Sequence, residues 1–115
     1  MCRAFMTSLT TQDPIRLVQI TDTHLYGKPS GTLLKMNTQD SFDEVIELVS
    51  ANEQDIDLIL ATGDIAQDAS ELAYQRFIDA MEKLATPFRW IPGNHDKAAV
   101  MQQLANEHLA NERLL

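Results

Sequence analysis

The sequence has little cysteine and few basic residues: Cys2 is the single cysteine, and 9 Lys and Arg stand against 17 Asp and Glu in 115 residues. One cysteine cannot close a disulfide within the chain, so the predicted fold does not depend on an oxidising compartment. The formal charge of −8 argues against a sequence-independent nucleic-acid binder, which requires a basic surface. No apolar run approaches the length of a membrane span.

The N-terminal residues also lack the apolar segment of a signal peptide, because Phe5, Met6 and Leu9 are separated by Thr and Ser. We therefore expect residues 1–13 to be a flexible extension and the protein to be cytoplasmic, without a membrane partner. Residues 14–115 are long enough for one small domain. Their composition, within a chain that is 44% hydrophobic and 23% charged, is typical of a folded globular protein.

Three short apolar runs, at residues 15–20, 56–60 and 88–91, are each followed by a polar turn. Such runs are typical of strands buried on both faces of a parallel sheet. Amphipathic helical patterns lie at residues 42–49 and 74–84, and a weaker one follows at residues 99–105.

Residues that favour helix N-termini precede the three helical patterns. Asn37 or Thr38 is expected to cap the first helix, Ser70 the second and Asp96 the third. The alternation of strands and helices predicts an α/β fold made of three βα units with a mainly parallel sheet and right-handed crossovers. Residues 26–37, between the first strand and the first helix, are predicted to form a substantial loop.

Side chains able to bind a metal follow each predicted strand. Asp22 and His24 follow the first strand, Asp64 the second, and Asn94 and His95 the third. Ligands of open α/β sheets bind outside the carboxyl ends of the strands, so these residues are expected to converge there. Taken singly, the aspartates could cap helices and the Gly-Asp pair could form a turn. A histidine inside the turn sequence at residues 93–96 is less ordinary, and the joint pattern favours a metal site.

The motifs at residues 22–24 (DTH), 63–64 (GD) and 93–96 (GNHD) resemble the first three motifs of the calcineurin-like metallophosphoesterases. The longer stretches at residues 19–25 and 61–68 are similar to the bacterial class III cyclic-nucleotide phosphodiesterases, of the cyclic-AMP type. The resemblance extends over residues 15–115. It implies half of a metallophosphoesterase β-sandwich with flanking helices, and a small-molecule cyclic nucleotide as substrate.

The resemblance further implies two divalent metal ions, which could be Mn, Fe or Zn. Asp22 and His24 would bind the first ion, Asn94 the second, and Asp64 would bridge them. A hydroxide between the ions would attack the phosphorus. Asn94 and His95 would contact the phosphate, and His95 would protonate the leaving oxygen as general acid.

The chain departs from the family pattern at two points. Many relatives place an aspartate three residues after the bridging one to orient the catalytic histidine, but Gln67 occupies this position here and Asp68 follows it. We expect Gln67 or Asp68 to support His95. The later histidine motifs of the family are absent, which predicts that the chain is a truncated N-terminal half. His108 does not replace them and is expected to be a solvated surface residue.

Two functions follow from these observations. The first is a cyclic-AMP phosphodiesterase that is impaired as a fragment, or a related enzyme with another phosphoester substrate. The second is a non-catalytic truncated product or a weak metal-binding fragment. An uncovered edge of the sheet further predicts self-association.

Overall fold

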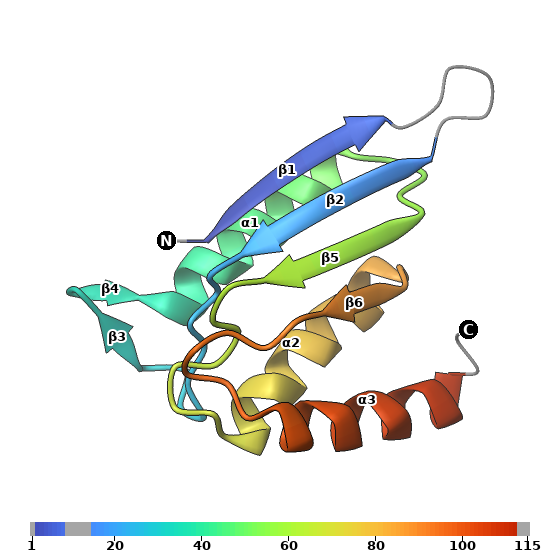
Figure 1. Cartoon of the computed structure of the whole chain (residues 1–115). Coiled ribbons are helices and arrows are strands. Elements are labelled where there is room, and N and C mark those ends of the chain that lie inside the picture. Colours follow the sequence, from blue (N-terminus) through green and yellow to red (C-terminus); the bar gives the residue numbers. More distant parts are fainter. Residues whose placement is uncertain (1, 9–14, 113–115) are drawn as a thin grey trace.

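The computed structural model describes residues 2–8 and 15–112, and Figure 1 shows one sheet with helices behind it. Strands β2 (Arg16–Thr21), β5 (Leu58–Thr62) and β6 (Phe88–Trp90) run parallel. Strand β1 (Arg3–Ser8) adds to the outer edge of β2 in the antiparallel direction, which gives the order β1-β2-β5-β6. The predicted α/β fold with a mainly parallel sheet is confirmed.

The predicted flexible extension is corrected by β1, since residues 3–8 form a strand in the structure. Its register places Arg3 opposite Thr21 and Ser8 opposite Arg16. The physical reason is that β2 would otherwise leave a row of unpaired backbone groups at its outer edge, and β1 satisfies them. Residues 1 and 9–13 of the predicted extension lie outside the described part of the chain.

One face of the sheet supplies the core. Side chains along β2 and β5 alternate between buried and half-buried positions, with Val18, Ile20, Ile59 and Ala61 on the buried face. The prediction of strands buried on both faces is therefore wrong for this structure. Figure 1 shows the reason: α1 (Thr38–Asn52) and α2 (Glu71–Leu84) both lie behind the sheet.

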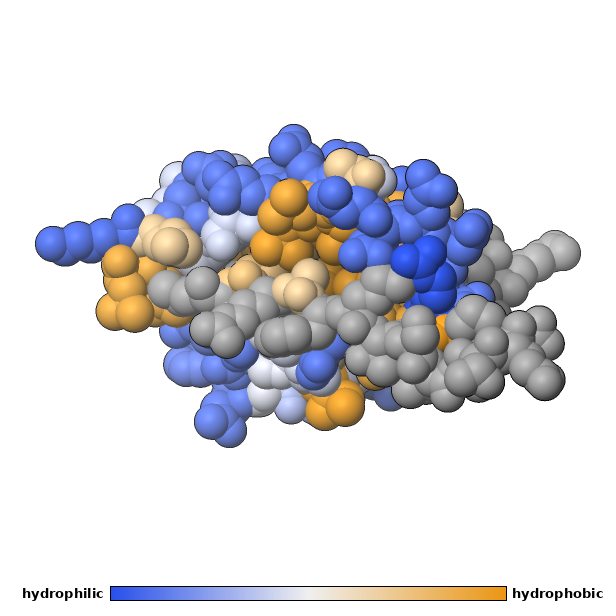
Figure 2. All heavy atoms as spheres, turned by 90° about the horizontal axis from the view of Figure 1, so that it is seen from above, coloured by the Kyte–Doolittle hydropathy of each residue, from blue (hydrophilic) through white to orange (hydrophobic). Residues whose placement is uncertain are grey.

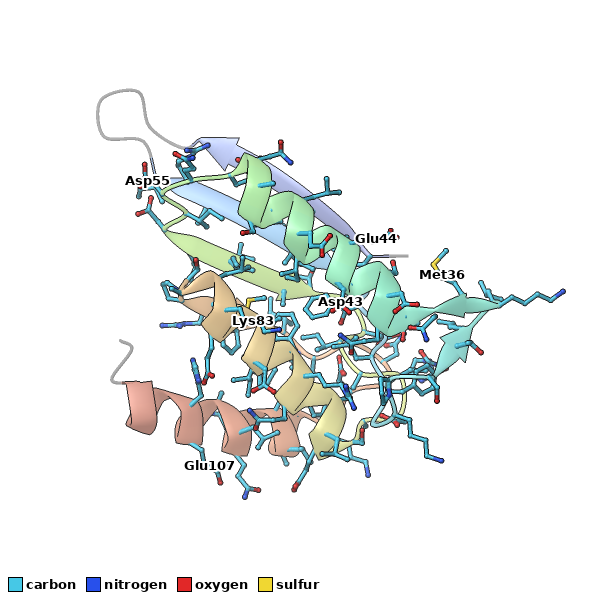
Figure 3. All side chains as sticks on the ribbon, turned by 180° about the vertical axis from the view of Figure 1, so that it is seen from behind. Met36, Asp43, Glu44, Asp55, Lys83 and Glu107 are labelled. Carbon is cyan, nitrogen blue, oxygen red and sulfur yellow. The ribbon has the colours of Figure 1, made fainter. Side chains whose placement is uncertain are left out.

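Helices α1 and α2 begin where the sequence predicts. Asn37 caps α1 by accepting a hydrogen bond from the backbone N–H of Asp40 at 2.9 Å, and Ser70 caps α2 through the N–H of Ala73 at 3.2 Å. The buried faces of α1 and α2 meet the sheet through an aromatic cluster centred on Phe77, whose ring contacts Phe42, Phe88 and Trp90. Charged residues of the helices lie on the outer side, where Figure 3 labels Asp43, Glu44, Lys83 and Glu107.

Helix α3 (Ala98–Glu112) contacts α2 and carries His108. The expectation that His108 is solvated is wrong, because the residue is only 8% exposed. Its ring lies 5.5 Å from that of Phe88, and its Nδ1 lies 3.4 Å from Glu82 Oε1 on α2. His108 therefore joins α3 to α2 and to the edge of the sheet.

The predicted loop at residues 26–37 contains a small hairpin of β3 (Thr32–Leu33) and β4 (Met36–Asn37). Leu34 and Lys35 turn the hairpin with left-handed backbone, at φ values of 50° and 67°. Leu34 is 86% exposed, and Figure 2 shows apolar surface at the hairpin end of the molecule. No helix within the described residues is long and apolar enough to cross a membrane.

Candidate functional site

The segments that follow β2 and β5 lie side by side at the carboxyl end of the sheet. The backbone N–H groups of Asp22 and His24 donate to the carbonyls of Thr62 and Asp64, each at 3.0 Å. Beyond them, Leu25 donates to Ile65 O at 2.8 Å. Backbone pairing thus continues past the ends of both strands and aligns Asp22, His24 and Asp64, as the sequence predicts.

Asp22 and His24 both adopt left-handed backbone, with φ values of 57° and 47°. Between them, Thr23 is buried, and its hydroxyl donates to Ile65 O at 2.7 Å. The two flanking side chains meet outside the sheet, with 3.8 Å between His24 Nε2 and Asp22 Oδ1. A carboxylate oxygen and an imidazole nitrogen at this separation can reach a common cation.

Two glycines allow the three segments to approach closely. A Cβ on Gly63 would collide with Asp22 Oδ1, and one on Gly93 would collide with Asp64 Oδ1. Gly63 also has a left-handed backbone, at φ 70°. Any larger residue would displace a site carboxylate, so glycine is required at both positions by space.

His24 is held by Gln67. The Nδ1 of His24 lies 2.8 Å from Gln67 Oε1, an acceptor for a proton on Nδ1, and Nε2 of the same ring faces Asp22. The expectation that Gln67 supports His95 is thereby corrected, because the Gln67 side chain reaches the histidine of the first motif. A neutral imidazole with a free Nε2 is the form in which histidine binds metals.

Asp68 serves a different loop. Its carboxylate accepts hydrogen bonds from Gly27 N–H at 2.9 Å, from Ser70 N–H at 3.1 Å and from the Ser70 hydroxyl at 2.8 Å. Desolvation raises the pKa of the Asp68 carboxyl, but these hydrogen bonds outweigh it and the pKa lies below its ordinary value. Asp68 therefore fixes the start of the loop after His24, and the expectation that it supports His95 is also corrected.

Asn94 and His95 lie in the turn after β6, and both residues are exposed. The His95 N–H donates to Asp64 Oδ1 at 2.9 Å, which connects the turn to the end of β5. Within the described residues, the His95 side chain has no hydrogen-bond partner. Its imidazole is therefore accessible to a bound molecule.

Asp96 is a site residue whose role the sequence prediction missed. Instead of capping α3, its carboxylate accepts from the N–H groups of Ile65, Ala66 and Gly93 and from the hydroxyl of Tyr74. Tyr74 is fully buried, and burial raises the pKa of its hydroxyl above the ordinary range. The helical pattern of α2 marks Tyr74 as a core residue, but a polar role for its hydroxyl depends on contacts distant in sequence.

The donors fit a metal in part. Asp22 and His24 form a converging pair with the ligand chemistry of Mn, Fe or Zn. No three His, Cys, Asp or Glu side chains gather into a metal-binding group within residues 2–8 and 15–112. One Asp64 oxygen is already engaged by His95 N–H. Asp22 and His24 can therefore supply two ligands to one ion, and a complete set of ligands requires further donors.

Comparison with known proteins agrees with this geometry. A profile of the calcineurin-like phosphoesterase family matches residues 15–114. The chain is 48% identical over 86 residues to a 3′,5′-cyclic adenosine monophosphate phosphodiesterase CpdA of Vibrio vulnificus, a match that covers 75% of this chain and 31% of that protein. It is 44% identical over 93 residues to the CpdA of Haemophilus influenzae, covering 81% of this chain and 34% of the relative.

A more distant relative is a 3′,5′-cyclic-nucleotide phosphodiesterase of a Nostoc species, with 33% identity over 100 residues, 87% of this chain and 38% of the relative. The chain thus spans about a third of the length of the curated relatives that it matches. The profile match covers most of the chain and includes all three motifs at the strand ends. The chain belongs to the calcineurin-like phosphoesterase family.

Proposed function

We propose that this chain carries part of the active site of a metal-dependent phosphodiester hydrolase whose substrate is 3′,5′-cyclic AMP. The observation that carries the proposal is the convergence of Asp22, His24 and Asp64 with the turn that bears Asn94 and His95. Relatives at 44–48% identity are named as cyclic AMP phosphodiesterases, which supports the choice of substrate. We place the activity in the cytoplasm, in line with the single cysteine.

Two divalent ions are the proposed cofactors. Asp22 and His24 would hold the first ion and Asn94 the second, and Asp64 would contribute its carboxylate to both. When bound, such ions supply an acidified water as nucleophile and neutralise charge on the phosphate oxygens. Asp22 and Asp64 are part of the chain's negative charge, but the cations that they would hold make the site attractive to an anionic substrate.

Asn94 and His95 are the residues proposed to touch the substrate. Both are exposed in the turn after β6, where the backbone N–H of His95 is anchored on Asp64. The amide of Asn94 and the imidazole of His95 bind phosphate oxygens. A protonated His95 then gives its proton to the departing ribose oxygen, which is a poor leaving group as an alkoxide.

A chimera tests this function, because the chain covers about a third of its relatives. The chain replaces the matching segment of the Vibrio vulnificus phosphodiesterase, and release of AMP from cyclic AMP in the presence of Mn²⁺ is followed by liquid chromatography. We expect hydrolysis by the chimera, and a loss on the order of 10²–10⁴-fold in kcat when His95→Ala removes the general acid. Asp64→Asn, which removes the carboxylate proposed for both ions, should also lose hydrolysis. Its matched control is Asp43→Asn, because Asp43 is an exposed carboxylate on α1 (Figure 3).

The outcomes separate the alternatives. Hydrolysis of p-nitrophenyl phosphate or bis(p-nitrophenyl) phosphate without cyclic AMP turnover would retain the hydrolase and reject the cyclic nucleotide. A folded chimera that hydrolyses none of these esters would favour a non-catalytic product. The same assay on the 115-residue chain alone determines whether the fragment is impaired, and its sedimentation determines whether it self-associates.

A further inference from the structure

The Asp96 carboxylate is the point where the ends of β5 and β6 are joined. Its Oδ2 accepts from Ile65 N–H at 3.0 Å and from Gly93 N–H at 2.8 Å. Its Oδ1 accepts from Ala66 N–H at 2.8 Å and from the Tyr74 hydroxyl at 2.9 Å. Four donors thus fill the four acceptor positions of one ionised carboxylate.

The four donors come from three different elements. Ile65 and Ala66 directly follow Asp64, Gly93 directly precedes Asn94, and Tyr74 lies on α2. The Tyr74 hydroxyl in turn accepts from Lys97 N–H at 2.9 Å, which closes the network on the segment that leads into α3. Tyr74 is buried and its edge packs on Trp90, so the network rests on the core.

The contacts at Gly93 show how closely this network brings the two loops together. A Cβ on Gly93 would lie 2.7 Å from the carbonyl carbon of Gly63 and 2.8 Å from Asp64 N. His95 N–H then reaches Asp64 Oδ1 at 2.9 Å. The position of the Asp64 carboxylate is therefore fixed from the β6 side as well as from its own strand.

We propose that Asp96, supported by Tyr74, is a positioning residue that sets the separation of Asp64 from Asn94 and His95. The inference rests on the proposed function, since it assigns these three residues to one site. Asparagine cannot replace Asp96 in this role, because its amide nitrogen is a donor and would face at least one backbone N–H group in either orientation of the amide. A purely structural residue would stabilise the chain without affecting the ligands, and the two roles are separable by experiment.

The test compares Asp96→Asn, Tyr74→Phe and a core control, Phe77→Leu, in the 115-residue chain. Phe77 packs against Phe42, Phe88 and Trp90 and forms none of the hydrogen bonds of the network, so we expect its replacement to lower the melting temperature and leave those hydrogen bonds in place. The first measurement is Mn²⁺ affinity by electron paramagnetic resonance. We expect Asp96→Asn to weaken it by about 10–100-fold, Tyr74→Phe by less, and Phe77→Leu not at all.

The second measurement needs no metal. The amide proton of His95 donates to Asp64 and not to Asp96, so its chemical shift and exchange rate report the position of one loop relative to the other. We expect both to change in Asp96→Asn and Tyr74→Phe and to stay constant in Phe77→Leu.

The two measurements distinguish failure of the positioning role from failure of the proposed metal site. Unchanged Mn²⁺ affinity and an unchanged His95 amide in a folded Asp96→Asn chain would overturn the positioning role. Absence of Mn²⁺ binding by the unaltered chain would count against the proposed metal site, and the His95 amide then decides the positioning role alone. If Asp96→Asn does not fold, Tyr74→Phe, which removes one of the four donors, carries the same test.

Discussion

His24 Nδ1 lies 2.8 Å from the amide oxygen of Gln67, and this contact leaves Nε2 of the same ring facing Asp22 Oδ1 at 3.8 Å. The amide oxygen can only accept, so it selects one tautomer of the imidazole. The contact with Gln67 therefore holds the His24 ring in one orientation, with Nε2 toward Asp22. A carboxylate at position 67 would hold the ring too, but would add negative charge.

Gln67→Leu should weaken Mn²⁺ binding by about 10–100-fold, since the His24 ring loses its fixed tautomer and orientation. Isothermal titration calorimetry measures the effect. Gln75→Leu is the control, because Gln75 is exposed on α2 and its side chain donates to Asp79 of the same helix. Equal affinity in the two variants would contradict the role of Gln67.

Gly93→Ala should damage the site more than Gly27→Ala does. A Cβ on Gly93 meets the Asp64 carboxylate and backbone atoms, whereas one on Gly27 meets the Ser70 hydroxyl at 2.9 Å and has its next neighbours at 3.5 Å and 3.6 Å, both side-chain atoms. We expect Gly93→Ala to lose a few kcal/mol of stability, on the order of 1–3, together with Mn²⁺ binding. Urea unfolding measures the stability of both variants and metal titrations measure their Mn²⁺ affinity. A Gly93→Ala chain with unchanged stability and Mn²⁺ affinity would refute the close approach.

Asp68 should make stability depend on pH below neutrality. Its pKa is lower in the folded chain than the ordinary 3.8, so its ionised form stabilises the fold above that value, and this contribution is lost as pH falls through the folded pKa. Asp68→Asn should therefore be less stable than the unaltered chain at pH 7, with a smaller difference at pH 3. Urea midpoints at both pH values check this, with Glu44→Gln as the exposed control (Figure 3).

Cys2 should react slowly with alkylating agents while the chain is folded. Burial raises the pKa of its thiol from 9.0 to about 12, and Asp22 adds to the increase. Because only the thiolate reacts, we expect iodoacetamide at pH 8 to modify the folded chain about 1,000-fold more slowly than the chain in urea. Equal rates, followed by mass spectrometry, would show that Cys2 is not buried by the fold.

Local sequence signals predicted much of the fold. The caps at Asn37 and Ser70 act on residues three positions away, and the apolar periods of α1 and α2 match their buried faces. The polar turns after the strands located the convergence of Asp22, His24 and Asp64, because parallel strands present their carboxyl ends at one edge. The roles of these residues as ligands stay predictions.

The features that the sequence did not predict depend on distant contacts. Strand β1 is a strand because β2 offers it a free edge. Asp96 stands where a helix cap is expected, yet its carboxylate is drawn to backbone groups at residues 65, 66 and 93. His108 is buried because α3 lies against α2 and Phe88.

The left-handed backbone at Asp22 and His24 lowers the stability of the fold, and it therefore affects which substitutions selection for stability would favour. A residue other than glycine in this conformation is strained, by about 1–3 kcal/mol, and two such residues here are separated only by Thr23. Selection for heat resistance alone would therefore favour changes such as His24→Gly, which relieve strain and abolish the proposed ligand. A lineage that keeps both side chains through such selection retains them for binding at the expense of thermal tolerance.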